Sequence, residues 1–134
     1  MKVLVDTSVW SLALRRVTPQ SDRWTEELSA LVDAKRAFLI GPIRQELLSG
    51  IRDFRQFEAV RERLRGFPDV AMDETDYEGG ADFYNRCRAQ GLQGSHTDFL
   101  ICSVAVRRAM SIFTTDRDFI GFERVLPIRL HAIH

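Results

Sequence analysis

Short apolar runs alternate along this chain with segments in which apolar residues recur every three or four positions. The runs lie at residues 2–5, 37–40, 70–72, 111–114 and 128–130, and each has the length of a buried strand. The intervening segments have helical spacing: Trp24, Leu28 and Leu31, for example, lie at positions i, i+4 and i+7. The pattern therefore predicts five strands, all short, separated by amphipathic helices.

Capping residues and helix breakers indicate where the helices begin and end. Either Ser21 or Asp22 can cap the helix of Trp24, after a loop at residues 18–20, and Thr97 or His96 can cap a helix that runs to Ala109. Other helices are predicted to start at Thr7 or Ser8, at Pro42, near Phe54 and at Glu74, and a helical turn is predicted at residues 116–122.

Strands that alternate with helices predict a parallel sheet covered on both faces. We expect an α/β fold of three layers (α/β/α, Rossmann-like) with a central, mostly parallel sheet of four to five strands. A length of 134 residues suits one domain, so residues 1–134 are expected to form a single unit. Right-handed crossovers place the carboxyl ends of all strands at one edge, where ligands bind in such sheets.

Composition is ordinary for a globular protein, with 45% hydrophobic and 28% charged residues and a net charge of zero. No window approaches the ~20 apolar residues that a membrane span needs, and the N-terminus lacks the apolar stretch of a secretory signal. We therefore expect a cytoplasmic protein without membrane contact, whose two cysteines are buried thiols. Of its 19 basic residues only Lys2 and Lys35 are lysine, and an arginine-rich surface is compatible with phosphate recognition.

Four acidic residues are predicted to meet at the carboxyl edge of the sheet. Asp6 follows the first strand, Glu46 lies in the first turns of the helix after the second, and Asp98 begins the helix that leads into the strand ending before Asp116. Asp118 is a fifth candidate at the same place. Each acid alone could simply cap a helix or face its positive end.

Together, the four acids call for a different explanation. Two carboxylates about 4 Å apart repel by roughly 4 kcal/mol at an effective dielectric constant of 20, so a cluster needs protons or cations. Carboxylate oxygens are hard ligands that suit Mg²⁺ or Mn²⁺.

The segments around these acids are "VLVDTSVW", "GPIRQELLSG", "HTDFLICSVA" and "IFTTDRDF". In this order and at this spacing they resemble the four acidic motifs of PIN domains, specifically the VapC-type ribonuclease toxins of bacterial toxin–antitoxin pairs. The resemblance extends over essentially the whole chain. It implies an Mg²⁺- or Mn²⁺-dependent endoribonuclease with Asp6, Glu46, Asp98 and Asp116 as catalytic metal ligands.

The same resemblance implies supporting residues and partners. Thr7 matches a polar position after the first acid, Thr114 or Thr115 matches the hydroxyl before the last, and Asp118 occupies a less essential position. RNA is the implied substrate, a small VapB-like antitoxin the implied inhibitor, and a homodimer the implied assembly. Arginines close to the motifs are candidates to hold the RNA, namely Arg44, Arg52, Arg86, Arg88 and Arg117.

Several alternatives remain open at this point. A phosphatase of the haloacid dehalogenase type also places Asp after its first strand, but it uses a second Asp two residues later, where this chain has Ser8. A PIN-like fold could act only as a nucleic-acid-binding module, although that would fit better if one of the four acids were missing. A DNA-directed nuclease without a toxin role is the third alternative.

Overall fold

The computed structural model describes residues 1–15 and 22–133. In chain order the elements are β1 (Val3–Val5), α1 (Thr7–Leu14), α2 (Arg23–Asp33), β2 (Ala37–Phe38), α3 (Gly41–Leu48), α4 (Phe54–Leu64), α5 (Glu74–Ala89), α6 (His96–Arg107), β3 (Ser111–Phe113) and α7 (Asp118–Val125). The predicted alternation of strands and helices is confirmed.

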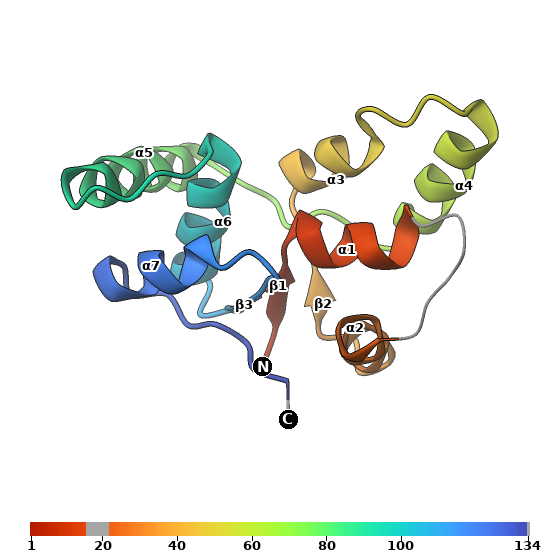
Figure 1. Cartoon of the computed structure of the whole chain (residues 1–134), viewed down its shortest axis with the longest axis horizontal. Helices are drawn as coiled ribbons and strands as arrows, with labels where there is room; N and C mark the ends of the chain where they lie inside the picture. Colours follow the sequence, from red (N-terminus) through yellow and green to blue (C-terminus); the bar gives the residue numbers. More distant parts are fainter. Residues whose placement is uncertain (16–21, 134) are drawn as a thin grey trace.

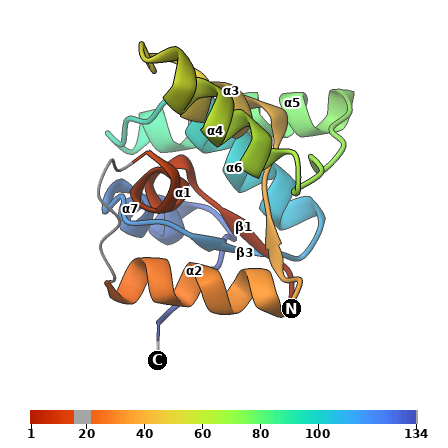
Figure 2. The ribbon, with the colours of Figure 1, turned by 90° about the vertical axis from the view of Figure 1, so that its right-hand side faces the viewer.

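A small parallel sheet lies at the centre, in the order β2-β1-β3. Helices α1 to α4 lie on one side of it and α5 to α7 on the other, which gives the three layers predicted from the sequence (Figure 1). Helix α2 runs alongside the strands, as the view turned by 90° shows (Figure 2). The central strand β1 is fully buried because both faces are covered: Val3, Leu4 and Val5 each have 0% exposure.

The predicted number of strands, four to five, is wrong for the described residues, which form three. Just before the first predicted segment, residues 70–72, Asp69 makes an isolated parallel bridge to Leu39, and within residues 128–130 only Leu130 makes one, to Ile112. The first segment cannot continue as a strand because Asp73, directly after Met72, already caps α5. In the second, Ile112 donates to the carbonyl of Arg129 at 2.8 Å and accepts from the N–H of His131 at 2.7 Å, and the pairing does not continue beyond this bridge.

Helix starts follow the sequence with three corrections: α3 begins at Gly41 and not at Pro42, the turn predicted at residues 116–122 is the helix α7, and the cap of α6 differs. Asp22 caps α2 through a reciprocal capping box with Thr25, whereas Ser21 and the predicted loop at 18–20 lie outside the described residues. Neither Thr97 nor His96 caps α6. The cap is Ser95, whose Oγ accepts from the N–H of Asp98 at 3.0 Å. The helix begins one residue earlier than predicted because a serine hydroxyl can reach the N3 amide that these two residues do not reach.

Helix α6 is buried along much of its length, and it packs closely against α5. Gly79 and Gly80 make this approach possible, since a Cβ on Gly79 would collide with the hydroxyl of Ser103 and one on Gly80 would contact Leu100. These glycines weaken a helix on intrinsic propensity, but here they bring two helices together. The close packing fixes the position of α6, whose first turn carries Asp98.

Two further expectations concern the thiols and the membrane. Cys87 and Cys102 are free and buried, as predicted. Among the helices in the described part of the chain, none combines the length and the apolar character needed to cross a membrane.

Candidate functional site

Asp6 lies directly after the central strand and is 6% exposed. Its backbone N–H donates to the carbonyl of Phe113 at 2.8 Å, so strand pairing with β3 holds its main chain. Although Asp6 is the N-cap residue of α1, its side chain makes no capping hydrogen bond. Instead, Oδ2 accepts from the hydroxyls of Ser8 at 2.8 Å and Thr114 at 2.7 Å. The simple explanation of Asp6 as a helix cap therefore does not account for its side chain.

Asp116 is held to the same network through Thr114. The Thr114 hydroxyl donates to Asp6 and accepts from the backbone N–H of Asp116 at 2.9 Å, so one oxygen connects the two acidic residues. The Oδ1 atom of Asp116 accepts from the backbone N–H of Asp118 at 2.9 Å. Asp118 thus supports the site through its main chain.

Glu46 reaches the site from α3, on the other side of Asp6. The hydroxyl of Thr7, the residue after Asp6, donates to Oε1 of Glu46 at 2.7 Å. This contact joins residues 39 positions apart in the sequence and connects the start of α1 to α3.

Asp98 comes from the first turn of α6. Its Oδ2 accepts from the N–H of Ser95 at 3.0 Å, the reverse half of the capping box. Burial raises the pKa of the Asp98 carboxyl, and the negative charges of Asp6 and Asp116 raise it further. Asp6 and Asp116 therefore lie close enough to Asp98 to oppose the ionisation of its carboxyl group.

The four acids share one pattern of bonding. Each is held through one carboxylate oxygen, while its second oxygen has no hydrogen-bond partner among the described residues. None of the four forms a salt bridge with a residue in these ranges. The site thus offers anchored, uncompensated carboxylate oxygens, a donor set that suits a hard divalent cation. Within residues 1–15 and 22–133, however, no group of three or more His, Cys, Asp or Glu side chains already stands in position to hold a metal ion.

The predicted supporting residues fall into two groups. Thr7 and Thr114 use their hydroxyls to hold acids, whereas Thr115 contributes its backbone N–H, which donates to the Ser8 hydroxyl at 3.0 Å. Ser8 takes part as well: its hydroxyl donates to the Asp6 carboxylate and accepts from the backbone N–H of Thr115.

Among the arginines suggested as RNA contacts, some bond other groups of the protein and one lines a pocket. The guanidinium of Arg44 bonds the Asp69 carboxylate at 2.8 Å and the carbonyls of Leu64 and Phe67, so it holds the end of α4. Arg86 pairs with an acid one turn away on α5, and Arg88 bonds a tyrosine hydroxyl. Arg117, in contrast, lines a pocket together with Asp116.

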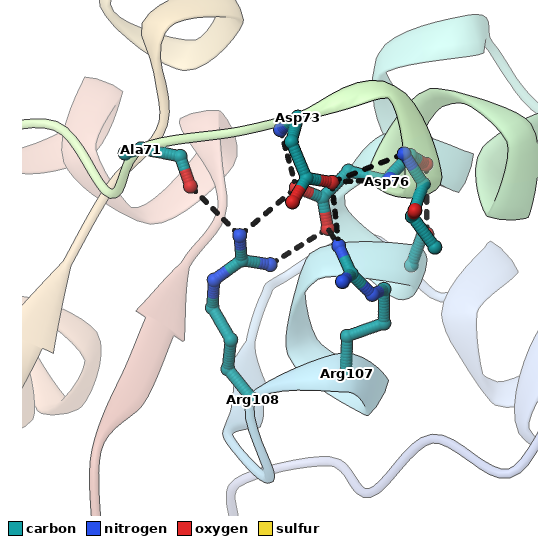
Figure 3. Close-up of polar contacts among 7 residues, drawn as sticks. Ala71, Asp73, Asp76, Arg107 and Arg108 are labelled. Atoms are coloured by element: carbon teal, nitrogen blue, oxygen red, sulfur yellow. Dashed lines mark hydrogen bonds and ion pairs between the residues drawn. The ribbon is translucent and has the colours of Figure 1, made fainter.

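One further acidic residue, Asp76, lies away from this edge, and the sequence patterns did not indicate a role for it. It is fully buried at 0% exposure, and it accepts from Arg107 at 2.7 Å and from Arg108 at 2.7 and 2.9 Å. Arg108 also bonds the carbonyl of Ala71 (Figure 3). The hydrogen bonds from Arg108, above all, hold the pKa of the Asp76 carboxyl well below its usual range.

Comparison with known proteins agrees with this architecture. Residues 3–125 match the model of the PIN domain, and the chain belongs to this family. It is 28% identical over 129 residues to "VapC ribonuclease Mb1587" of Mycobacterium bovis, an alignment that covers 95% of this chain and 96% of the relative. The identity to "Ribonuclease VapC11" of Mycobacterium tuberculosis is also 28%, with the same coverage.

Solved structures share the fold. The structure of FitAcB from Neisseria gonorrhoeae superposes with a TM-score of 0.76 at 19% identity, covering 97% of this chain and 96% of that one. VapBC2 from Rickettsia felis, bound to a DNA fragment from its promoter, also gives a TM-score of 0.76, at 18% identity and 98% coverage of both chains. These similarities extend along nearly the whole chain, as the motif order predicted.

Proposed function

We propose that this protein is a metal-dependent endoribonuclease and the toxin of a type II toxin–antitoxin pair. The observation that carries the proposal is the set of uncompensated carboxylates at the carboxyl edge of the sheet. Their anchored oxygens suit Mg²⁺ or Mn²⁺, and the family and the ribonuclease relatives support RNA as the substrate.

In this proposal Asp6, Glu46, Asp98 and Asp116 hold the cation. When bound, Mg²⁺ or Mn²⁺ supplies positive charge beside the scissile phosphate and lowers the pKa of a water molecule. The protein's own contribution is to bring the four carboxylates together and to orient them. Thr7, Ser8 and Thr114 orient two of them, Glu46 and Asp6, by hydrogen bonds. A carboxylate oxygen left without such a bond is available to accept the proton of the attacking water.

The test is cleavage of a single-stranded RNA by purified protein with Mg²⁺ or Mn²⁺, with excess EDTA, and with the Asp98→Asn variant. We expect cleavage only by the wild-type protein with metal, and an unchanged circular dichroism spectrum for the variant. Full activity in excess EDTA would contradict the metal-dependent mechanism. Cleavage of single-stranded DNA but not RNA would favour the DNA-directed alternative, and binding without cleavage of either would favour a binding module.

An apolar groove supports the antitoxin partner. A pocket of about 450 Å³ lies between α1, α2 and α4 and is lined mainly by apolar side chains, including Trp10, Leu14, Leu28 and Phe67. We propose that a segment of a VapB-like antitoxin packs there, that the toxin acts as a homodimer, and that both act in the cytoplasm. Growth arrest on overexpression, relieved by a small neighbouring gene, tests the pairing. Absence of both effects would contradict it.

A further inference from the structure

A second pocket, of about 540 Å³, begins at Asp116 and extends over β3. Its walls come from the start of α2, the start of α7 and the C-terminal residues, including Arg23, Trp24, Asp116, Arg117, Leu130 and Ile133. We call it the Trp24 pocket. One of the proposed metal ligands therefore forms part of a hollow that is large enough for a small organic ligand.

The Trp24 pocket contains a flat aromatic platform. The indole of Trp24 stacks on Phe113, with ring centroids 5.8 Å apart, and packing against this buried residue fixes its orientation. The guanidinium carbon of Arg23 lies 4.9 Å from the centroid of the Trp24 ring. Indole and guanidinium planes are the surfaces on which proteins stack unpaired nucleobases.

The charge on the rim of the pocket is positive apart from Asp116. Arg23 and Arg117 are exposed, and neither forms a salt bridge with any described residue. His131, also in the lining, is already paired with Glu27 at 2.6 Å. Two arginines without carboxylate partners are thus left to attract a phosphate chain that passes Asp116.

We propose that the Trp24 pocket binds one unpaired nucleotide of the RNA substrate, adjacent to the phosphate that is cut. The base stacks with Trp24 and Arg23, and Arg117 binds a backbone phosphate. The proposal rests on the proposed ribonuclease function and deepens it, because it states that the substrate is single-stranded at this position and that one pocket contributes to the choice of base.

Binding is measured by fluorescence anisotropy with a labelled ten-nucleotide single-stranded RNA and Mg²⁺, in the Asp98→Asn background so that no cleavage occurs. Trp24→Ala should raise Kd about tenfold, in line with the loss of one base–aromatic stack, and Trp24→Phe should restore much of the affinity. Arg117→Gln should reduce the slope of log Kd against log salt by about 0.7, the value for one phosphate contact on a single strand.

Matched controls lie outside the pocket. Arg124→Gln removes the same charge from α7, the helix that begins directly after Arg117, and Tyr77→Ala removes an exposed aromatic ring on α5. Both should leave Kd and the salt slope unchanged. Thermal denaturation checks that each variant is folded, and Arg117→Gln, at an exposed position, keeps the proposal testable if Trp24→Ala does not fold.

A second readout uses the cleaving protein and an RNA pool randomised around the cut. Trp24→Ala should flatten the base preference at one position next to the cut and leave the preferences elsewhere unchanged. If Trp24→Ala and Arg117→Gln bind RNA like the controls, the pocket is not a nucleotide site, although Asp98→Asn would still identify the nuclease. Loss of antitoxin affinity without loss of RNA affinity would overturn the proposal in favour of a protein ligand.

Discussion

The two ends of α6 give two carboxylates opposite electrostatic surroundings: Asp98 at the first turn is half-buried, and Asp76 beside the last turn is fully buried. At its first turn Asp98 faces Asp6 and Asp116 with no basic partner among the described residues, and burial together with these charges raises its pKa. At its last turn and C-cap, Arg107 and Arg108 bond the fully buried Asp76, whose pKa is lowered.

The difference lies in whether the protein itself supplies the positive charge that compensates each carboxylate. At Asp76 the fold supplies the cations itself, so the negative charge is neutralised without any ligand and ties α5 to α6 (Figure 3). At Asp98 the fold supplies hydrogen bonds to orient the carboxylate but no compensating charge. A proton or a cation must then supply the compensation, and the proposed metal ion would do so.

The largest effect on stability should come from removing the cations at Asp76. The double change Arg107→Met and Arg108→Met leaves a buried carboxylate uncompensated, and we expect a loss of about 3–5 kcal/mol in the free energy of unfolding, measured by urea denaturation. Arg86→Met is the control, since its pair with Asp82 on α5 is half-exposed and worth at most about 1 kcal/mol. A double variant as stable as this control would contradict the assigned role of the pair.

At the other end of α6, the effect should fall on activity. Asp98→Asn keeps an oxygen that can accept from the N–H of Ser95 but removes the negative charge. Loss of a residue that only hydrogen-bonds a metal ligand costs about 10- to 100-fold in activity, so for a proposed ligand we expect at least about a hundredfold loss of RNA cleavage. Circular dichroism should be unchanged. An active Asp98→Asn protein would remove this residue from the proposed metal ligands.

The hydroxyl that connects Asp6 and Asp116 should have a smaller effect. Thr114→Val removes one bond from each, and we expect a loss of roughly 10- to 100-fold in kcat/KM and a weaker metal affinity. Thr114→Ser keeps the hydroxyl and should retain most of the activity. Equal activity of the valine and serine variants would show that the hydroxyl is dispensable.

The smallest effects are on the pH dependence of stability, and their signs should be opposite. Because folding lowers the pKa of Asp76, the unfolded chain binds more protons than the folded one. Ionised Asp76 therefore stabilises the folded protein above pH 3.8, and this stabilisation is lost as the pH falls toward the folded pKa. The pKa of Asp98 is raised, so in metal-free protein the stability falls as the pH rises through its folded pKa.

Thermal denaturation without metal, as a function of pH, checks both signs. Near neutral pH, Asp98→Asn should melt slightly higher than the wild type and Asp76→Asn lower. Below pH 4 the difference between Asp76→Asn and the wild type should shrink. Melting temperatures that shift in the same direction for both variants near neutral pH would contradict the comparison.

Local patterns predicted much of this molecule. The start of α4, the cap of α2 and the strand before Asp6 follow from apolar spacing and from side chains that bond the nearest backbone, which are short-range interactions. The acid positions could be predicted as well, because parallel strands bring their carboxyl ends to one edge. The two extra strands were wrong because a short apolar run does not determine whether a partner strand continues beside it.

The sequence by itself determined the order of elements, the edge at which the acids lie and the family, since these depend on periodicity and on motifs within single segments. Only the tertiary structure decided which carboxylates are compensated. Asp76 and Asp98 both lie at the third position of a helix with a capping box. They differ because Arg107 and Arg108, some thirty residues along the chain from Asp76, fold back onto it, while no described basic residue reaches Asp98. Charge pairing at that separation depends on how α5 and α6 pack, which no local pattern specifies.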